Sequence, residues 1–154
     1  MVTQVKYVHT NLIARDWKRL ADFYTRVFGC VSVLPERDLS GQWLDDATGV
    51  PHAHIRGAHL RLPGYGDAGP TLEIFQYDSE LDKPSTAINR PGFGHLAFAV
   101  DDVDVARDAV IAAGGCDVGK IVAVEIPGAG KIRFVYVTDP EGNVIELQQW
   151  SKQN

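Results

Sequence analysis

Two stretches of the sequence, 86 residues apart, follow one pattern. Residues 8–30 read VHTNLIARDWKRLADFYTRVFGC, and residues 94–116 read GHLAFAVDDVDVARDAVIAAGGC. In each stretch a histidine, His9 or His95, lies in strand-like sequence and is followed by an aspartate, a helical pattern and Gly-Cys. The histidine precedes the glycine by 20 residues and the cysteine by 21 in both copies. This agreement indicates an internal duplication.

The ends of the two halves also match. LEIFQY at 72–77 carries Glu73, and IELQQW at 145–150 carries Glu146. The histidine and the glutamate are 64 residues apart in the first half and 51 apart in the second, so the first half has 13 extra residues. We expect the excess in QWLDDATGVPHAH or LPGYGDAGP, which are both rich in turn residues.

Local patterns predict the same order of elements in each half. Residues 5–12 alternate as a strand does, and a helix over residues 17–28 is expected between the cap Asp16 and the stop Gly29. A second helix is expected from Asp102 to about Gly114. Further strands are predicted at 53–62, 71–77, 121–126, 132–138 and 143–149. A half of about 75 residues supplies only a thin core alone, so the halves should pair.

The predicted fold class is therefore α+β. Two paired βαβββ modules would form a cup-shaped mixed sheet with the helices on its outer face. Residues 1–154 would make a single domain, with module 1 at 5–77, a linker at 78–92 and module 2 at 93–150. The linker is expected from the polar, Pro-containing sequence DSELDKPSTAINRPG.

The two-residue period of a strand separates the polar residues from the bulky aliphatic ones. Glu73 points away from Leu72 and Ile74, and Glu146 points away from Ile145 and Leu147. His95 is likewise opposite Leu96 and Phe98. If the aliphatic face lies beneath a helix, histidines and glutamates lie on the helix-free side of the sheet.

Pseudo-twofold packing of the halves would let His9, Glu73, His95 and Glu146 converge from four strands. Two imidazoles and two carboxylates suit Zn, Ni, Co, Fe or Mn. Two ionised carboxylates about 5 Å apart repel by roughly 3 kcal/mol at an effective dielectric near 20, and a divalent cation reverses that sign. The four residues are the predicted metal ligands.

Composition limits the class of protein. The 154 residues are 45% hydrophobic and 23% charged, which is typical of a soluble globular chain. The net charge of −5 and the pI near 5.4 disfavour nucleic-acid binding. No apolar run is long enough for a membrane span, the N-terminal residues do not resemble a secretory signal, and two cysteines do not make a disulfide framework. A cytoplasmic protein is expected.

The motifs HTNL…FYTRVFG, GHLAFAVDD and YVTDPEGNVIEL resemble the vicinal oxygen chelate superfamily over residues 5–150. The superfamily includes glyoxalase I, methylmalonyl-CoA epimerase, extradiol dioxygenases and the fosfomycin and bleomycin resistance proteins. The resemblance implies a cup around one divalent metal ion per site, with Zn, Ni or Co first and Mn or Fe next. The family's ligand positions match His9, Glu73, His95 and Glu146, and this set is most similar to glyoxalase I.

The resemblance implies an enzyme that removes a proton next to a carbonyl, with Glu146 as the first choice of base and Glu73 as the second. If the proton returns to the next carbon, the protein would be a lactoylglutathione lyase. If it returns to the opposite face of the same carbon, the protein would be a methylmalonyl-CoA epimerase. The substrate would be a small molecule, such as a glutathione or CoA thioester or adduct. A homodimer is expected, with the site within one chain or across two.

Two other functions stay open. An extradiol dioxygenase would share Tyr136, Asp139-Pro140 and Glu146, but residues 121–135 lack the histidine that its signature places before the tyrosine. A non-catalytic binding or resistance protein would keep the cup without the metal. His52, His54 and His59 lie in PHAHIRGAH without a carboxylate at ligand spacing, so they are interpreted as a polar strand face or a cup wall.

Overall fold

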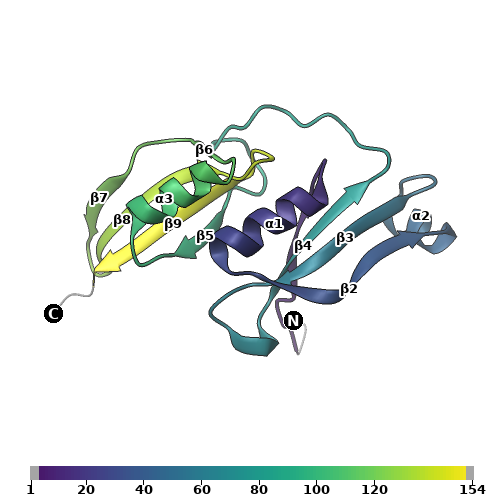
Figure 1. Cartoon of the computed structure of the whole chain (residues 1–154), viewed down its shortest axis with the longest axis horizontal. Coiled ribbons are helices and arrows are strands. Elements are labelled where there is room, and N and C mark those ends of the chain that lie inside the picture. The colour runs from purple at the N-terminus through teal and green to yellow at the C-terminus, as the bar shows by residue number, and fades with distance from the viewer. Residues whose placement is uncertain (1–3, 152–154) are drawn as a thin grey trace. The chain divides into compact units, whose positions relative to one another are not determined.

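The computed structural model describes residues 4–151 and divides into two compact units after Asp82 (Figure 1). We call residues up to Asp82 unit 1 and residues from Lys83 unit 2. Residues 78–92, the predicted linker, contain neither a helix nor a strand. Each unit has its own sheet with a helix packed on one face of it.

Unit 1 is a four-stranded sheet in the order β1-β4-β3-β2. Its elements in chain order are β1 (His9–Ile13), α1 (Trp17–Phe28), β2 (Val31–Ser40), α2 (Gln42–Thr48), β3 (His54–Arg61), a short 3₁₀ helix (Gly66–Ala68) and β4 (Thr71–Tyr77). The first strand pairs in parallel with the last, while the other neighbours are antiparallel. The chain thereby places its first and last strands side by side.

The helix α1 forms where the sequence predicts it. Asp16 caps it by accepting a hydrogen bond from the backbone N–H of Arg19, and Gly29 ends it in the left-handed conformation. The helix buries one face against the sheet through Trp17, Leu20, Phe23 and Tyr24. On the sheet, β3 and β4 contribute fully buried aliphatic side chains, namely Leu60, Leu72 and Ile74.

Unit 2 repeats this plan with five strands. Its elements are β5 (Leu96–Ala99), α3 (Val103–Ala112), β6 (Cys116–Asp117), β7 (Val122–Ile126), β8 (Gly130–Thr138) and β9 (Val144–Ser151). The order is β5-β9-β8-β6 with β7 also on β8, and β5 is again parallel to the last strand. Val103 and Val110 of the helix, like Ile145 and Leu147 of β9, are fully buried.

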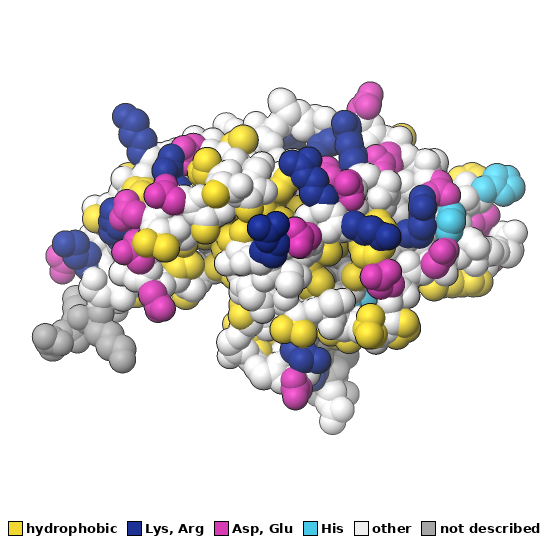
Figure 2. Space-filling view, in the orientation of Figure 1, with side chains coloured by type: hydrophobic (Ala, Val, Ile, Leu, Met, Phe, Trp, Pro, Cys, Tyr) yellow, Lys and Arg dark blue, Asp and Glu magenta, His cyan; other side chains and the backbone are white. Residues whose placement is uncertain are grey.

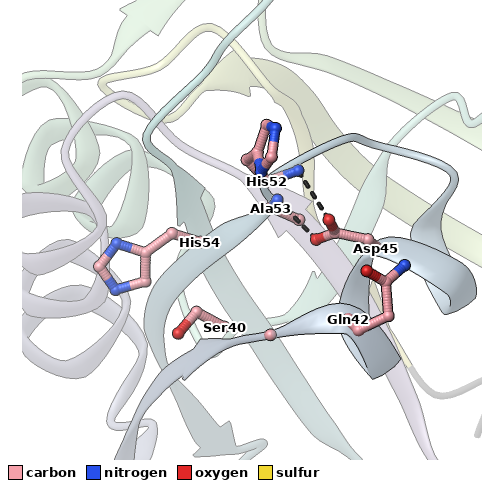
Figure 3. Close-up of a pocket in the computed structure, with 7 residues that line it drawn as sticks. Ser40, Gln42, Asp45, His52, Ala53 and His54 are labelled. Atoms are coloured by element: carbon pink, nitrogen blue, oxygen red, sulfur yellow. Dashed lines mark hydrogen bonds between the residues drawn. The ribbon is translucent and has the colours of Figure 1, made fainter.

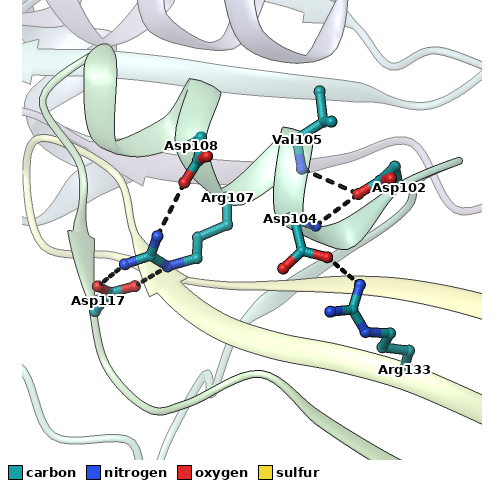
Figure 4. Close-up of polar contacts among 7 residues, drawn as sticks. All are labelled: Asp102, Asp104, Val105, Arg107, Asp108, Asp117 and Arg133. Carbon is teal, nitrogen blue, oxygen red and sulfur yellow. Dashed lines mark hydrogen bonds and ion pairs between the residues drawn. The ribbon is translucent and has the colours of Figure 1, made fainter.

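Polar contacts hold the start and the middle of α3 (Figure 4). The carboxylate of Asp102 accepts hydrogen bonds from the backbone N–H groups of the next turn. Arg107 pairs with Asp117 on β6, and Arg133 on β8 pairs with Asp104. These ion pairs connect α3 to β6 and β8.

The α+β class and its βαβββ modules are confirmed, with local differences that include the short strand β6, which was not predicted. β2 was not among the predicted strands, because VSVLPERDLS contains a proline and several charged residues and does not alternate. The predicted insertion of unit 1 forms α2 and the 3₁₀ helix, so both turn-rich stretches contribute to it. Neither addition interrupts the pairing of β1, β3 and β4.

The surface carries both signs of charge. Basic and acidic side chains are interspersed over the face in view in Figure 2. Within residues 4–151, no helix is long and apolar enough to cross a membrane.

Candidate metal site

The last strand of each unit presents a glutamate on the face away from its helix. In β4, Leu72 and Ile74 are fully buried while Glu73 between them is on the opposite face. In β9, Ile145 and Leu147 are fully buried and Glu146 is opposite them. The side-chain exposure of the two glutamates is nearly equal, at 13% and 15%.

In unit 1, three side chains converge on Glu73. The Nε2 atom of His59 lies 2.8 Å from Oε2 of Glu73, and Nε2 of His9 lies 3.8 Å from Oε1. The side-chain amide of Asn11 donates a hydrogen bond of 2.9 Å to Oε1. Strand register explains the arrangement, because His59 on β3 and Asn11 on β1 are both directly opposite Glu73.

His59 is the member of this group that sequence reasoning set aside. Its carboxylate partner is 14 residues away in the chain, and the antiparallel register of β3 and β4 brings the two together. Burial lowers the pKa of His59, and the nearby Glu73 opposes that shift in part. The backbones come unusually close beside it, since a Cβ on Gly57 would lie 2.0 Å from the carbonyl oxygen of Ile74.

In unit 2, His95 and Tyr136 contact Glu146. Nε2 of His95 lies 3.0 Å from Oε2 of Glu146, and the rings of His95 and Tyr136 are 5.1 Å apart edge to face. Tyr136 is directly opposite Glu146 in the β8–β9 ladder. Burial, followed by the charge of Glu146 and a hydrogen bond to it, raises the pKa of Tyr136. The phenol is therefore the hydrogen-bond donor to the carboxylate.

The turn before β9 is fixed by Asp139, which is fully buried. Its Oδ1 accepts hydrogen bonds from the backbone N–H groups of Glu141 and Asn143, both at 2.9 Å, and its Oδ2 accepts one from the Asn143 amide. Gly142 has a positive φ of 79°, which favours glycine. This turn starts β9 in the register that directs Glu146 away from the helix.

The donors fit a divalent transition metal. One donor atom each from His9, His59 and Glu73 can be chosen so that all lie within 4.8 Å of one another. Ligands held about 2.1 Å from a tetrahedral ion are about 3.4 Å apart, so small side-chain movements would suffice. The 3.0 Å separation in the His95–Glu146 pair also suits two ligands of one ion. Imidazole with carboxylate accommodates Zn, Ni, Co, Fe and Mn.

His54 is bound in a different way from His59. Its Nε2 lies 2.6 Å from Asp38 and its Nδ1 lies 2.6 Å from Asp78, so both ring nitrogens are engaged by different carboxylates. Hydrogen bonds to Asp38 and then to Asp78 raise the pKa of His54. The residue links β2 to the end of β4 and is not part of the cluster around Glu73.

A pocket of about 370 Å³ also lies in unit 1, beside α2 (Figure 3). Asp45 accepts hydrogen bonds there from the backbone N–H groups of His52 and Ala53, which holds the turn into β3. This pocket shares no residue with the cluster at Glu73. The residues that line it are Ser40, Gly41, Gln42, Asp45, His52, Ala53 and His54.

Comparison with known proteins identifies the family. Residues 6–147 match the family model described as Glyoxalase/Bleomycin resistance protein/Dioxygenase superfamily. A probable lactoylglutathione lyase of Vibrio parahaemolyticus is 28% identical over 147 residues, covering 94% of this chain and 90% of the relative.

Two solved structures share the fold. A glyoxalase family protein from Bacillus cereus superposes with a TM-score of 0.76 at 19% identity, covering 99% of this chain and 97% of the other. A fosfomycin resistance protein from Listeria monocytogenes, complexed with Mn(II) and sulfate, gives a TM-score of 0.52 at 14% identity, with 98% and 95% covered. With the family match spanning nearly all of the residues that form both units, the chain belongs to the glyoxalase, bleomycin resistance protein and dioxygenase superfamily.

Proposed function

We propose that this protein is a divalent-metal-dependent isomerase or lyase that removes a proton next to a carbonyl. The observation that carries the proposal is the repeated His–Glu pair, which both units place on the helix-free face of their sheets. The glyoxalase fold and the probable lactoylglutathione lyase of Vibrio support the same class of reaction. A glutathione hemithioacetal is the first substrate to test, and methylmalonyl-CoA is the second.

In this proposal His9, Glu73, His95 and Glu146 hold one metal ion. When bound, the ion supplies Lewis-acid stabilisation of the negative charge that develops on the substrate oxygen. The protein's own part begins with binding and orientation, because both carboxylates are mostly shielded from water and each contacts a histidine of its own unit. Shielding from water strengthens the attraction between these groups and a cation.

Glu146 is the proposed base. A carboxylate oxygen of Glu146 takes the proton from the carbon next to the substrate carbonyl and then returns it. The hydroxyl of Tyr136 donates a hydrogen bond to Glu146 and limits the directions in which that carboxylate can turn. Delivery of the proton by Glu146 to the neighbouring carbon gives an isomerised product. Inversion of configuration would instead need a second acid to protonate the same carbon from its opposite face.

Glu73 is better placed to remain a ligand. Asn11 holds one of its oxygens and His59 holds the other. The residue of unit 2 that corresponds to Asn11 is Ala97, which is opposite Glu146 and has no side-chain donor. Glu146 therefore lacks the amide contact that restrains Glu73.

Metal analysis followed by turnover tests the proposal. The purified chain should contain one Zn, Ni or Co ion per site, with Mn or Fe as further candidates, and should lose turnover on chelation and regain it with metal. Isomerisation of the methylglyoxal–glutathione hemithioacetal would establish a lyase, and racemisation at the α-carbon of methylmalonyl-CoA would establish an epimerase. Oxygen consumption with a catechol, or tight ligand binding without metal, would replace the proposal with a dioxygenase or a binding protein.

A mixed-dimer experiment addresses the proposed homodimer and the origin of the four ligands. His9→Asn removes a ligand of unit 1, and His95→Asn removes one of unit 2, so each variant alone should be inactive. If pairs from different chains share a site, a dimer of the two variants contains one intact site and regains activity. If each site lies within one chain, mixing restores nothing.

A further inference from the structure

We propose that His59 is a metal ligand, so that unit 1 alone presents His9, His59 and Glu73 as a two-histidine, one-carboxylate site. The inference rests on the proposed function only in sharing His9 and Glu73 with it. It assigns to unit 1 a metal affinity that does not depend on His95 or Glu146. The chemical class of the ligand is a divalent transition-metal cation such as Zn, Co or Ni.

The geometry of the three donors supports this assignment. Nε2 of His59 lies 2.8 Å from Oε2 of Glu73, and Nε2 of His9 lies 3.8 Å from Oε1 of the same carboxylate. The centroids of the two imidazole rings are 5.7 Å apart in an edge-to-face arrangement, and the two Nε2 atoms lie nearest different oxygens of the carboxylate. Three strands, β1, β3 and β4, supply one donor each, and the sheet hydrogen bonds fix the spacing between them.

The neighbours of His59 suit a ligand as well as a hydrogen-bond donor. Its Nδ1 lies 3.3 Å from the hydroxyl oxygen of Thr71. A hydroxyl can donate or accept, so Thr71 is compatible with either tautomer of the ring. With the proton on Nδ1, Nε2 is free to bind a cation, and the hydrogen bond to Thr71 orients the ring as partners outside the ligand sphere do in metal sites.

The corresponding position of unit 2 is chemically different. His59 is opposite Glu73, and Tyr136 is opposite Glu146 in the equivalent ladder. The hydroxyl of Tyr136 hydrogen-bonds to Glu146, and a protonated phenol is a weaker metal donor than an imidazole. Unit 2 therefore offers two strong donors where unit 1 offers three, and unit 1 should bind the ion more tightly.

The test uses the full-length chain with His95→Asn and Glu146→Gln, which removes the unit 2 pair. Titration of this metal-free variant with Co(II), followed by its visible absorption, should still show one bound ion. Adding His59→Gln should weaken Co(II) binding by more than the about 10–100-fold that loss of an orienting partner costs. The matched control is His52→Asn, a histidine outside the cluster whose positive φ of 54° Asn tolerates.

Glutamine is chosen because its amide can still donate a hydrogen bond to Glu73 but is a poor ligand. If His59 only orients Glu73, His59→Gln will bind Co(II) like its parent or lose no more than the about 10–100-fold of an orienting partner, and the proposal is wrong. Failure of the His95→Asn, Glu146→Gln variant to bind Co(II) while the unaltered chain does would also overturn it. Equal thermal stability of the variants without metal excludes misfolding as the cause.

Proton NMR of the Co(II)-loaded His95→Asn, Glu146→Gln variant gives a second readout. Two contact-shifted, exchangeable ring N–H signals are expected, from His9 and His59, and one signal would contradict the proposal. These measurements are independent of turnover. Co(II) bound by unit 1 in a chain that processes no substrate would support the metal site and refute the proposed function.

Discussion

Units 1 and 2 share a strand frame but surround the same carboxylate differently. Glu73 and Glu146 occupy equivalent positions in the last strands, each contacted by a histidine from the first strand region. The two strand neighbours directly opposite Glu73, Asn11 and His59, both contact its carboxylate. Of the two residues directly opposite Glu146, Tyr136 makes such a contact and Ala97 does not. The duplicated backbone sets where the carboxylates lie, and the neighbouring strands set what each can do.

The two units also differ in the elements that they add to the shared strand frame. Unit 1 contains α2, which packs Leu44 on a second small core with Ala53 and Ile55. That core takes in Phe75 and Tyr77, which share the strand face of Glu73. Unit 2 instead extends its sheet with β7, whose residues are all exposed. The insertion thus covers the far part of the face that carries the unit 1 cluster.

The largest expected difference between the units concerns their carboxylates. Glu146→Gln should lower kcat by about 10²–10⁴-fold, because an amide cannot accept the proton. Glu73→Gln should chiefly weaken metal binding, so its turnover should recover as the metal concentration is raised. Steady-state rates measured against metal concentration separate the two effects. Glu125→Gln, on exposed β7, is the control, and equal loss of kcat in both glutamate variants would refute the distinction.

The two cores should respond alike to a cavity. Ile74 and Ile145 are both fully buried next to the glutamate of their unit. Ile74→Ala and Ile145→Ala should each lower the free energy of unfolding by about 2–5 kcal/mol. Urea unfolding followed by circular dichroism measures this, and two separate transitions would show that the units unfold independently. Ile126→Ala, on exposed β7, should change the free energy by less than about 0.5 kcal/mol.

The helix caps should differ by a smaller amount. Asp102 accepts two backbone hydrogen bonds at the start of α3, from Asp104 and Val105, while Asp16 accepts one at the start of α1, from Arg19. Replacement of a capping aspartate by alanine costs about 0.5–2 kcal/mol, and we expect Asp102→Ala to be the more costly variant. Thermal unfolding gives the comparison, with Asn at either site expected to retain the cap. A greater loss of thermal stability from Asp16→Ala than from Asp102→Ala would contradict this expectation.

The smallest expected effect is a pH dependence that arises in unit 1. Asp38 and Asp78 raise the pKa of His54 above its usual 6.5, so the protonated ring is favoured in the folded chain. Its contribution to stability is full below pH 6.5 and is lost as the pH rises through the raised value. The stability difference between the unaltered chain and His54→Gln should therefore shrink from pH 5.5 to pH 8.5.

Ring-proton NMR gives the pKa of His54 directly, and a value below 6.5 would contradict the assignment. Unit 2 makes its comparable links with Arg107 and Arg133, whose guanidinium groups keep their charge throughout this range. Removing Arg133 should thus change stability by the same amount at both ends of the pH range.

The sequence predicted much of this frame because each feature has a local cause. The helix at 17–28 follows from Asp16, Gly29 and the spacing of its apolar residues, and the outward direction of Glu73 and Glu146 follows from the two-residue period of their strands. His9 contacts Glu73 and His95 contacts Glu146, each within its own unit. The predicted convergence of all four residues on one metal ion remains a proposal.

The features that were missed depend on pairing between distant strands. PHAHIRGAH contains no carboxylate, so neither the contact of His59 with Glu73 nor the position of His54 between Asp38 and Asp78 could be read from that segment alone. The register of β3 against β4 creates the first contact, and that register is set by the fold of the whole unit. β2 escaped prediction because its pairing with β3 overrides an unfavourable local sequence.

The parallel pairing of β1 with β4 would determine when, during folding, unit 1 could acquire the proposed metal ion. His9 and its ladder partner Thr71 are 62 residues apart, and every other strand of the unit lies between them in the chain. Contacts across such a separation carry a large loop-closure cost and form late. In a chain that emerges from the ribosome, the imidazole of His9 therefore stays away from Glu73 until β4 has paired with β1. Binding of a cation by these residues would then indicate that unit 1 has finished folding.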